Sequence, residues 1–345
     1  MSSALTSLGW DEFFAAAAEP FASTHLIGRV VRAERGLVDC LTDAGPLRAR
    51  QRLGDAPAVT GDWVVAIDDD AGWWVDGVLP RRTTIERAAA SGKSAAQVLA
   101  ANVDVVLVTV PVFPEPRPAM IERLVALAWD SSATPVIVVT KADLSPQSAA
   151  IAAELAESVP GVAVMLVSAT TGDGVAELID VVGSGVTACL LGRSGAGKST
   201  LVNALVGADV VATGEIRRDG KGRHTTTTRE LVALPGGGVL LDTPGLRGAG
   251  LWVGEDGLER AFSDIEALVA DCRFSDCAHE TEPGCAVLAA VDDGRLVPRR
   301  LASWHKLQRE ARWMASRADA RLRSEQRRSW KLLTTEMRRS GRARP

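Results

Sequence analysis

From Val103 to Asp242 the chain alternates nearly continuous apolar runs with amphipathic or polar segments. The apolar runs are VDVVLVTV, PVIVVT, VAVMLVSA, VTACLL and GVLLD, starting at residues 103, 135, 162, 186 and 238. Behind a proline between the first two runs, apolar residues recur at helical spacing at Ile121, Leu124, Val125 and Ala128. This alternation predicts an α/β domain with a parallel sheet covered on both faces. The run LVALPGGGVLLD, residues 231–242, instead predicts an antiparallel hairpin at the sheet edge.

The chain before this region is organised differently. Residues 25–86 hold short apolar runs separated by turn clusters, which predicts a small β-barrel or sandwich. Its tryptophans Trp63, Trp73 and Trp74 either stack on nucleic-acid bases or pack in the core and rim. The polar, small-residue stretch 87–97 is expected to be a linker. We therefore expect three domains, at residues 1–86, 87–255 and 256–345.

Charge is distributed unevenly over the 345 residues. The net charge is −4, but the segment from Arg295 to the end carries 16 basic and 4 acidic residues. A basic tail on an acidic body indicates a polyanionic partner, most often nucleic acid, although a charge run can also be a solvated helix face. Neither a charged signal-peptide region nor an apolar run of membrane-spanning length is evident, so we expect a cytoplasmic protein with no membrane partner.

The stretch GRSGAGKS at residues 192–199 fits the phosphate-loop pattern G-x-x-x-x-G-K-[ST] and stands between an apolar run and a helical segment. In such a loop the backbone N–H groups surround the phosphates, Lys198 reaches the β- and γ-phosphate oxygens, and Ser199 binds Mg²⁺. The expected nucleotide-binding residues are Gly192, Arg193, Ser194, Gly195, Ala196, Gly197, Lys198, Ser199 and Thr200. The pattern alone does not separate ATP from GTP, and a chance strand–turn–helix with a lysine is the alternative.

Two further elements follow the phosphate loop. Asp242 ends an apolar run three residues before Gly245, where a carboxylate can bind Mg²⁺ through water and the glycine N–H can face the γ-phosphate. Between loop and aspartate, residues 220–231 are rich in threonine and resemble a segment that closes over nucleotide. One of Thr225–Thr228 is expected to bind Mg²⁺; the alternative is an ordinary flexible loop.

Guanine recognition is predicted by two segments that precede the phosphate loop. In TKAD, comprising Thr140, Lys141, Ala142 and Asp143, the carboxylate can accept hydrogen bonds from the guanine N1–H and exocyclic amine, which adenine lacks. The backbone of Ser168 and Ala169 can then face the guanine O6. Many guanine sites have asparagine where this chain has Thr140, so one contact is weaker or replaced. All these segments end apolar strands, where open α/β sheets bind ligands. The reversed order predicts a circularly permuted GTPase domain.

A separate Cys/His cluster lies late in the chain. Cys272, Cys277, His279 and Cys285 follow the pattern C-x₄-C-x-H-x₅-C, four ligands in a short segment of low apolar content. Such a set predicts one closed structural Zn²⁺ site, the alternative being buried thiols and a surface histidine. Cys40 and Cys189 lie apart in strand-like runs and are expected to be core residues.

Many stretches in one collinear order are similar to the ribosome small-subunit-dependent GTPase A family (RsgA, also called YjeQ). They include GDWVV at residue 61, LPRRT at 79, QVLAANVDVV at 97, TKADL at 140, GRSGAGKSTLVNAL at 192, GRHTTTTREL at 222, DTPG at 242 and DCAHETEPGCAV at 276. The resemblance implies an N-terminal OB barrel, a permuted GTPase domain and a C-terminal zinc domain with helices. It further implies GTP hydrolysis stimulated by the 30S ribosomal subunit, rRNA binding and a role in late 30S assembly. We expect a monomer.

The residue after D-x-x-G is Leu246, whereas many GTPases have a glutamine there to orient the attacking water. Slow intrinsic turnover is therefore expected, with another group or the partner completing the site. His224, beside the threonines, is a candidate for that role; it can equally be a loop histidine without one. Two rival functions remain: a zinc-dependent RNA-binding module with a relic nucleotide site, and a GTPase acting on another RNA assembly.

Overall fold

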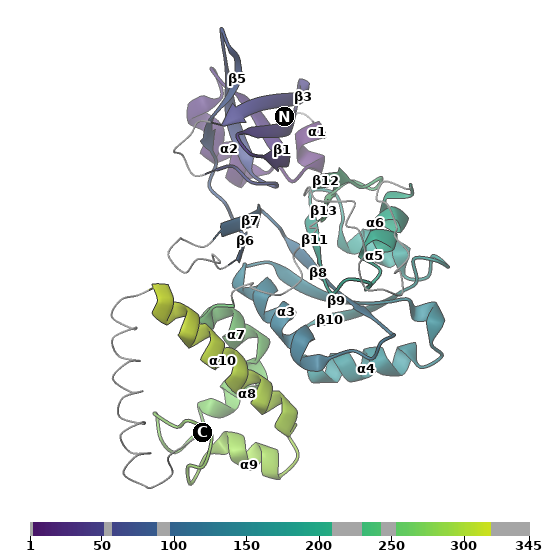
Figure 1. Cartoon of the computed structure of the whole chain (residues 1–345), viewed down its shortest axis with the longest axis vertical. Coiled ribbons are helices and arrows are strands. Elements are labelled where there is room, and N and C mark those ends of the chain that lie inside the picture. Colours follow the sequence, from purple (N-terminus) through teal and green to yellow (C-terminus); the bar gives the residue numbers. More distant parts are fainter. Residues whose placement is uncertain (1–2, 52–56, 88–96, 209–229, 243–252, 319–345) are drawn as a thin grey trace, which may run out of the picture.

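The computed structural model describes residues 3–51, 57–87, 97–208, 230–242 and 253–318. It has three parts: an N-terminal barrel with short helices, a central α/β sheet, and a C-terminal group of helices (Figure 1). The expected multidomain architecture is confirmed. None of the helices described is both long and apolar enough to cross a membrane.

Five strands form the barrel in the order β1-β2-β3-β5-β4, and pairing of β1 with β4 closes it. All these pairings are antiparallel except that of β3 with β5. They are β1 (Leu26–Glu34), β2 (Leu37–Thr42), β3 (Gly45–Gln51), β4 (Trp63–Asp69) and β5 (Gly72–Val78). Cys40 lies in the barrel core, as expected. Three short helical elements precede the barrel: α1 (Ser3–Ser7), α2 (Glu12–Ala18) and the 3₁₀ turn η1 (Glu19–Phe21). Trp10 and Phe14 pack on Trp63, which is fully buried, so core packing is the correct interpretation for Trp63.

The central sheet has the strand order β10-β9-β8-β11-β13-β12, parallel except for β12. Its strands are β8 (Val105–Pro111), β9 (Thr134–Thr140), β10 (Ala163–Val167), β11 (Thr187–Leu191), β12 (Glu230–Ala233) and β13 (Val239–Asp242). The predicted antiparallel hairpin is confirmed as β12–β13, but it does not lie at a free sheet edge, because β12 also pairs with β1. Each of these strands coincides with one of the apolar runs or with the hairpin.

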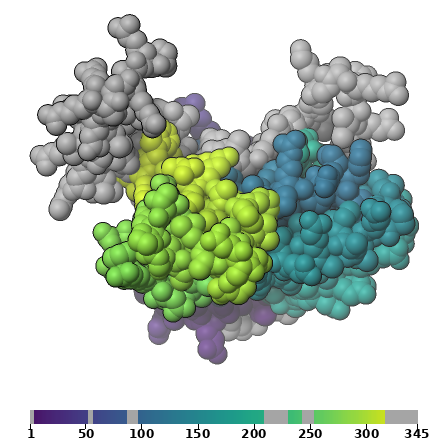
Figure 2. Space-filling view, turned by 90° about the horizontal axis from the view of Figure 1, so that it is seen from below, coloured from purple at the N-terminus to yellow at the C-terminus, as the bar shows by residue number. Residues whose placement is uncertain are grey.

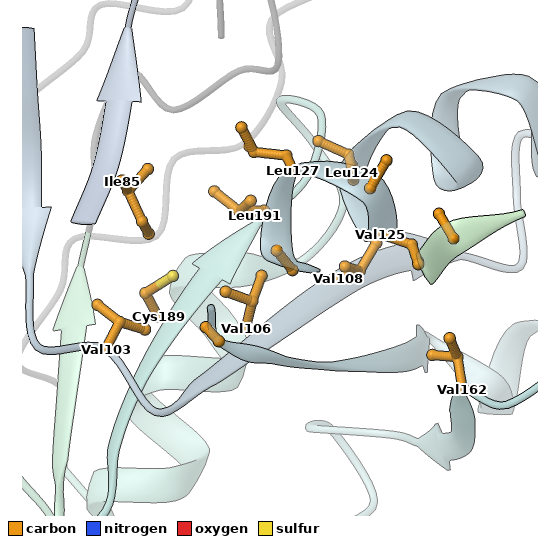
Figure 3. Packing of buried hydrophobic residues seen from close by; sticks show 14 of the residues in the cluster. Ile85, Val103, Val106, Val108, Leu124, Val125, Leu127, Val162, Cys189 and Leu191 are labelled. Carbon is orange, nitrogen blue, oxygen red and sulfur yellow. The ribbon is translucent and has the colours of Figure 1, made fainter. Parts of the chain in front are cut away.

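Helices cover both faces of this sheet, also as predicted. They are α3 (Pro118–Asp130), α4 (Ser148–Ser158), α5 (Val175–Val181) and α6 (Lys198–Val206), with the 3₁₀ turn η2 (Ala142–Leu144) after β9. Helix α3 begins with its proline and packs Leu124 and Val125 on the face that also carries Val106 and Cys189 (Figure 3). The other face is covered by α5 and α6 through apolar side chains that include Leu178 and Leu201.

Barrel and sheet are joined directly. Strand β1 pairs with β12 at Arg32 and Glu230, so the barrel continues the sheet.

The stretch 87–97 was expected to be a linker, and this is wrong at both its ends. Arg87 ends β6 (Thr84–Arg87), Gln97 begins β7 (Gln97–Ala101), and the two residues pair antiparallel; residues 88–96 lie outside the described part of the chain. Local composition missed this pairing because small polar residues also suit hairpin ends.

The C-terminal part of the described chain consists of helices, two of which pack against α3. The helices are α7 (Glu255–Ala261), α8 (Ser263–Val269), α9 (Ala286–Asp292) and α10 (Pro298–Ala318). Helices α7 and α10 contact α3, and Figure 2 shows the green and yellow C-terminal helices against the blue and teal central part. The buried guanidinium of Arg300 joins the two parts: it donates to Glu122 of α3 at 3.3 Å and to Asp264 of α8 at 2.5 Å. The basic tail beyond Ala318 lies outside the described residues.

Candidate functional site

The phosphate-loop sequence connects β11 to α6 at the carboxyl edge of the sheet. Two glycines are required by this geometry. A Cβ on Gly192 would lie 2.2 Å from Thr109 Oγ1, closer than any side chain can approach. Gly197 has a φ of +85° at the N-terminal cap of α6, a left-handed conformation that favours glycine. The chain therefore forms a strand, a glycine turn and a helix N-terminus, the arrangement that surrounds phosphate groups.

Lys198 and Ser199 occupy the first turn of α6. The Lys198 Nζ group donates to the carbonyl oxygens of Gly192 and Arg193, both at 2.8 Å, which holds the side chain back over the loop. Ser199 is half-buried beside it, and Arg193, Ser194 and Thr200 are exposed. An ammonium group over the phosphate-loop backbone provides positive charge for a polyphosphate.

The predicted guanine-reading residues follow β9 and β10. Lys141 adopts a left-handed backbone conformation with a φ of 60°, which turns the chain into η2 and exposes Asp143. Ser168 is fully buried and donates a hydrogen bond of 2.6 Å to Asp143 Oδ1. The Ser168 oxygen in turn accepts the Thr171 N–H at 3.2 Å, and Ala169 beside it is half-buried. The two segments therefore form one hydrogen-bonded unit.

This unit meets the phosphate loop although 56 residues separate the contacting positions. Thr140 Oγ1 donates to the Ala196 carbonyl oxygen at 2.7 Å. A Cβ on Gly197 would lie 3.7 Å from Lys141 Cε, in ordinary contact. The reversed chain order does not separate the segments, because β9 and β11 both flank β8 in parallel and so end at one edge.

The remaining predicted residues are only partly placed. Asp242 is the last residue of β13, which pairs in parallel with β11, so its backbone reaches the same edge as the phosphate loop. Gly245, Leu246, His224 and Thr225–Thr228 lie outside the described residues. Their assignments rest on the sequence.

The Cys/His cluster lies in the segment between α8 and α9. The four ligand atoms of Cys272, Cys277, His279 and Cys285 lie within 4.8 Å of one another. The Sγ atoms of Cys272 and Cys285 are 3.9 Å apart, and His279 Nδ1 is 3.5 Å and 3.4 Å from them. A tetrahedral zinc ion with ordinary bond lengths implies about 3.8 Å between sulfurs and about 3.6 Å between sulfur and nitrogen. The donor set therefore fits Zn²⁺.

Glu282 organises the loop that carries these ligands, and the sequence reading did not single it out. Its carboxylate accepts the N–H groups of Ala278, Glu280 and Thr281 at 2.9–3.0 Å. These backbone hydrogen bonds, with Thr281 contributing most, lower the pKa of Glu282 to about 2. The sequence feature that could have pointed to Glu282 is its position directly before Pro-Gly, between the ligands His279 and Cys285. Arg300 was missed too, because its partners lie on four other helices, α3, α4, α7 and α8.

Comparison with known proteins agrees with this geometry. A model of the RsgA GTPase family, described as "RsgA GTPase", matches residues 78–252. A Streptomyces avermitilis protein named small ribosomal subunit biogenesis GTPase RsgA is 50% identical, over 95% of this chain and 91% of its own. One with the same name from Opitutus terrae is 43% identical over 95% of each chain.

Solved structures are similar as well. YjeQ from Thermotoga maritima is 27% identical with a TM-score of 0.62, covering 83% of this chain and 98% of its own. YloQ, described as a circularly permuted GTPase, shares the fold with a TM-score of 0.60 at 24% identity, over 83% of this chain and 95% of its own. The chain therefore belongs to the RsgA GTPase family and is a GTP-hydrolysing enzyme.

Proposed function

We propose that this protein hydrolyses GTP to GDP and phosphate as a late assembly factor of the 30S ribosomal subunit, which stimulates its turnover. The observation that carries the nucleotide assignment is the hydrogen bond from Thr140 to Ala196. It brings the base-reading segment and the phosphate loop to one edge of the sheet, as recognition of both ends of one nucleotide requires. The Streptomyces and Opitutus relatives are named as small ribosomal subunit biogenesis GTPases, which supports the ribosomal role.

Each group of the site then has a role. The loop from Gly192 to Thr200 surrounds the phosphates, and the charge of Lys198 offsets that of the transferred phosphoryl group. Ser199 and Asp242 would hold Mg²⁺, which supplies charge stabilisation at the phosphates. Asp143 accepts the guanine N1–H and amine, and the Ser168–Ala169 backbone faces O6.

The attacking water needs a group that Leu246 does not supply, because an aliphatic side chain forms no hydrogen bond. We assign this role to His224 or to the ribosomal partner, which makes intrinsic turnover slow. Replacing His224 with alanine tests the choice. Loss of stimulated turnover with nucleotide affinity retained supports His224, and unchanged turnover assigns the role to another group.

The RNA partner is supported by two surfaces, one on helix α10 and one on the barrel. On α10 the side chains of Lys306, Arg309 and Arg312 recur at three-residue spacing and are exposed, with exposed Trp313 at the end of the row. Such a row suits a phosphate backbone, and the tryptophan offers a face to an unpaired base. On the barrel, the Arg50 guanidinium lies over the half-buried Trp74 ring at 5.6 Å.

The Cys/His cluster holds one structural Zn²⁺ that orders the segment between α8 and α9.

We further propose a monomeric, cytoplasmic protein with the domain division 1–86, 87–255 and 256–345. The boundary at residue 86 falls within the β6–β7 hairpin, which would belong with the GTPase domain in a refined division.

The decisive experiment is the GTPase rate of the purified chain with 30S subunits, with 50S subunits and alone. Stimulation by 30S only is the expected result, whereas equal or greater stimulation by 50S would redirect the function to another RNA assembly. The Lys198→Ala variant tests the other rival. If it supports 30S assembly as well as the unmodified chain, the nucleotide site is a relic.

A further inference from the structure

Thr140 belongs by sequence to the base-reading segment, yet its side chain is directed to the other end of the site. The residue is 4% exposed, and its hydroxyl donates to the Ala196 carbonyl oxygen at 2.7 Å. A hydroxyl has a single proton to donate. Because that proton is used within the protein, Thr140 Oγ1 has none left to donate to a bound base.

The carbonyl that accepts this bond lies between two glycines of the phosphate loop. Ala196 is buried, and its neighbours Gly195 and Gly197 both have positive φ, at +81° and +85°. Glycines on both sides allow many backbone orientations, so the loop alone does not specify one. A hydrogen bond from a side chain outside the loop to the Ala196 carbonyl oxygen restricts this freedom.

Peptide planarity carries the effect to the phosphate side of the loop. The Ala196 carbonyl and the Gly197 N–H belong to one peptide plane, and in a trans peptide they point in opposite directions. Fixing the oxygen toward Thr140 therefore fixes the Gly197 N–H on the opposite side. Gly197 caps α6, where backbone N–H groups are directed at an anion.

We propose that Thr140 is a positioning residue for the phosphates, acting through the Ala196–Gly197 peptide, and not a base contact. This inference rests on the proposed nucleotide site. It also explains the departure from the asparagine of many guanine sites. The shorter, β-branched threonine has few rotamers and needs no freedom to reach a carbonyl that already lies beside it.

The test uses Thr140→Val, which keeps the side-chain shape and removes the hydroxyl, and Thr140→Ser, which keeps the hydroxyl. Affinities for GDP and inosine diphosphate are measured by calorimetry on the full chain. Inosine diphosphate lacks the exocyclic amine, so the ratio of the two affinities reports base recognition alone. For Thr140→Val we expect GDP and inosine diphosphate to bind about tenfold more weakly, with their ratio unchanged, because a buried carbonyl loses its partner. Thr140→Ser should restore most of the affinity.

Thr134→Val serves as the matched control, since Thr134 lies at the other, exposed end of β9. It should bind both nucleotides like the unmodified chain. The proposal would be overturned if Thr140→Val bound GDP with unchanged affinity. It would also be overturned if this variant lost part of its preference for GDP over inosine diphosphate. Failure of the nucleotide site itself gives a different result: the unmodified chain would bind ADP as tightly as GDP, or neither.

Discussion

Ser168 and Asp143 follow different strands, β10 and β9, yet the buried Ser168 hydroxyl donates a 2.6 Å hydrogen bond to Asp143 Oδ1. A carboxylate on an exposed turn would otherwise rotate freely. The hydrogen bond holds one carboxylate oxygen and orients the other, so the side chain is prepared before a base arrives. Such preorganisation lowers the ordering cost of binding.

Replacing Ser168 with alanine should therefore weaken guanine recognition. We expect GDP affinity to fall about tenfold, equivalent to about 1.4 kcal/mol, because hydrogen bonds to charged groups contribute about 1.5–3 kcal/mol. The preference for GDP over inosine diphosphate should fall too, in contrast to the Thr140 variants. Competition calorimetry gives both values. Thr170→Ala, on the exposed neighbouring residue, is the control, and an unchanged GDP preference in Ser168→Ala would contradict this role.

Metal analysis should find one zinc ion per chain. Chelation should disorder the segment from Cys272 to Cys285, because apart from the ligands little of it is buried. Hydrogen exchange in this segment should rise, while GDP affinity stays unchanged because no zinc ligand comes from the nucleotide edge of the sheet. A chain that purifies without zinc yet protects these amides would contradict a structural metal site.

Glu282 should slow the loss of this metal. In Glu282→Gln a neutral amide oxygen replaces the carboxylate that accepts three backbone N–H hydrogen bonds, so the ligand loop is held less firmly. Zinc should therefore transfer to a chelator several-fold faster at pH 7. The pKa of Glu282 is held at about 2, below its ordinary 4.5. The carboxylate contribution is therefore complete above about pH 4.5 and is lost as the pH falls through about 2.

The rate ratio between variant and unmodified chain should consequently be constant from pH 8 to about pH 5. A colorimetric chelator assay over that range measures it, with Glu280→Gln as the neighbouring exposed control. A ratio that drifts across the range would show that a group other than Glu282 is titrating.

Arg300 should be essential for docking the C-terminal helices. Besides Glu122 and Asp264 it donates to the carbonyl oxygens of Ser158 and Ala261, both at 2.9 Å. Within the described part of the chain, Arg300→Met leaves the fully buried Glu122 with only Arg299 as a charged partner, and breaking a buried ion pair typically costs about 3–5 kcal/mol. Hydrogen exchange should rise across the contact between α3 and α10.

The exposed Arg295 pairs with nearby Asp293 and joins no second helix, so Arg295→Met is a matched control among the described residues and should leave exchange unchanged. The double variant Glu122→Gln with Arg300→Met should recover part of the loss, because the stranded charge is gone. Equal protection in Arg300→Met and the unmodified chain would show that apolar packing alone docks the helices.

Local pattern determined much of this protein. Runs of apolar residues gave the strands their positions, helical spacing placed α3, and short motifs placed the phosphate loop and the zinc ligands. Each of these signals is contained within a few consecutive residues, where steric preference and burial act directly on the chain. The linker expected at 87–97 failed because composition does not reveal which residues pair across a hairpin.

The tertiary structure alone decided which distant residues meet. Neither the pairing of β1 with β12 nor the hydrogen bond from Thr140 to Ala196 leaves a local trace in the sequence. The same is true of the four elements gathered by Arg300. Such contacts depend on strand order and on the orientation of packed elements, which arise when the whole chain buries its apolar surface. For this reason the sequence predicts a base contact for Thr140, whereas its hydrogen bond in the folded chain supports the phosphate loop.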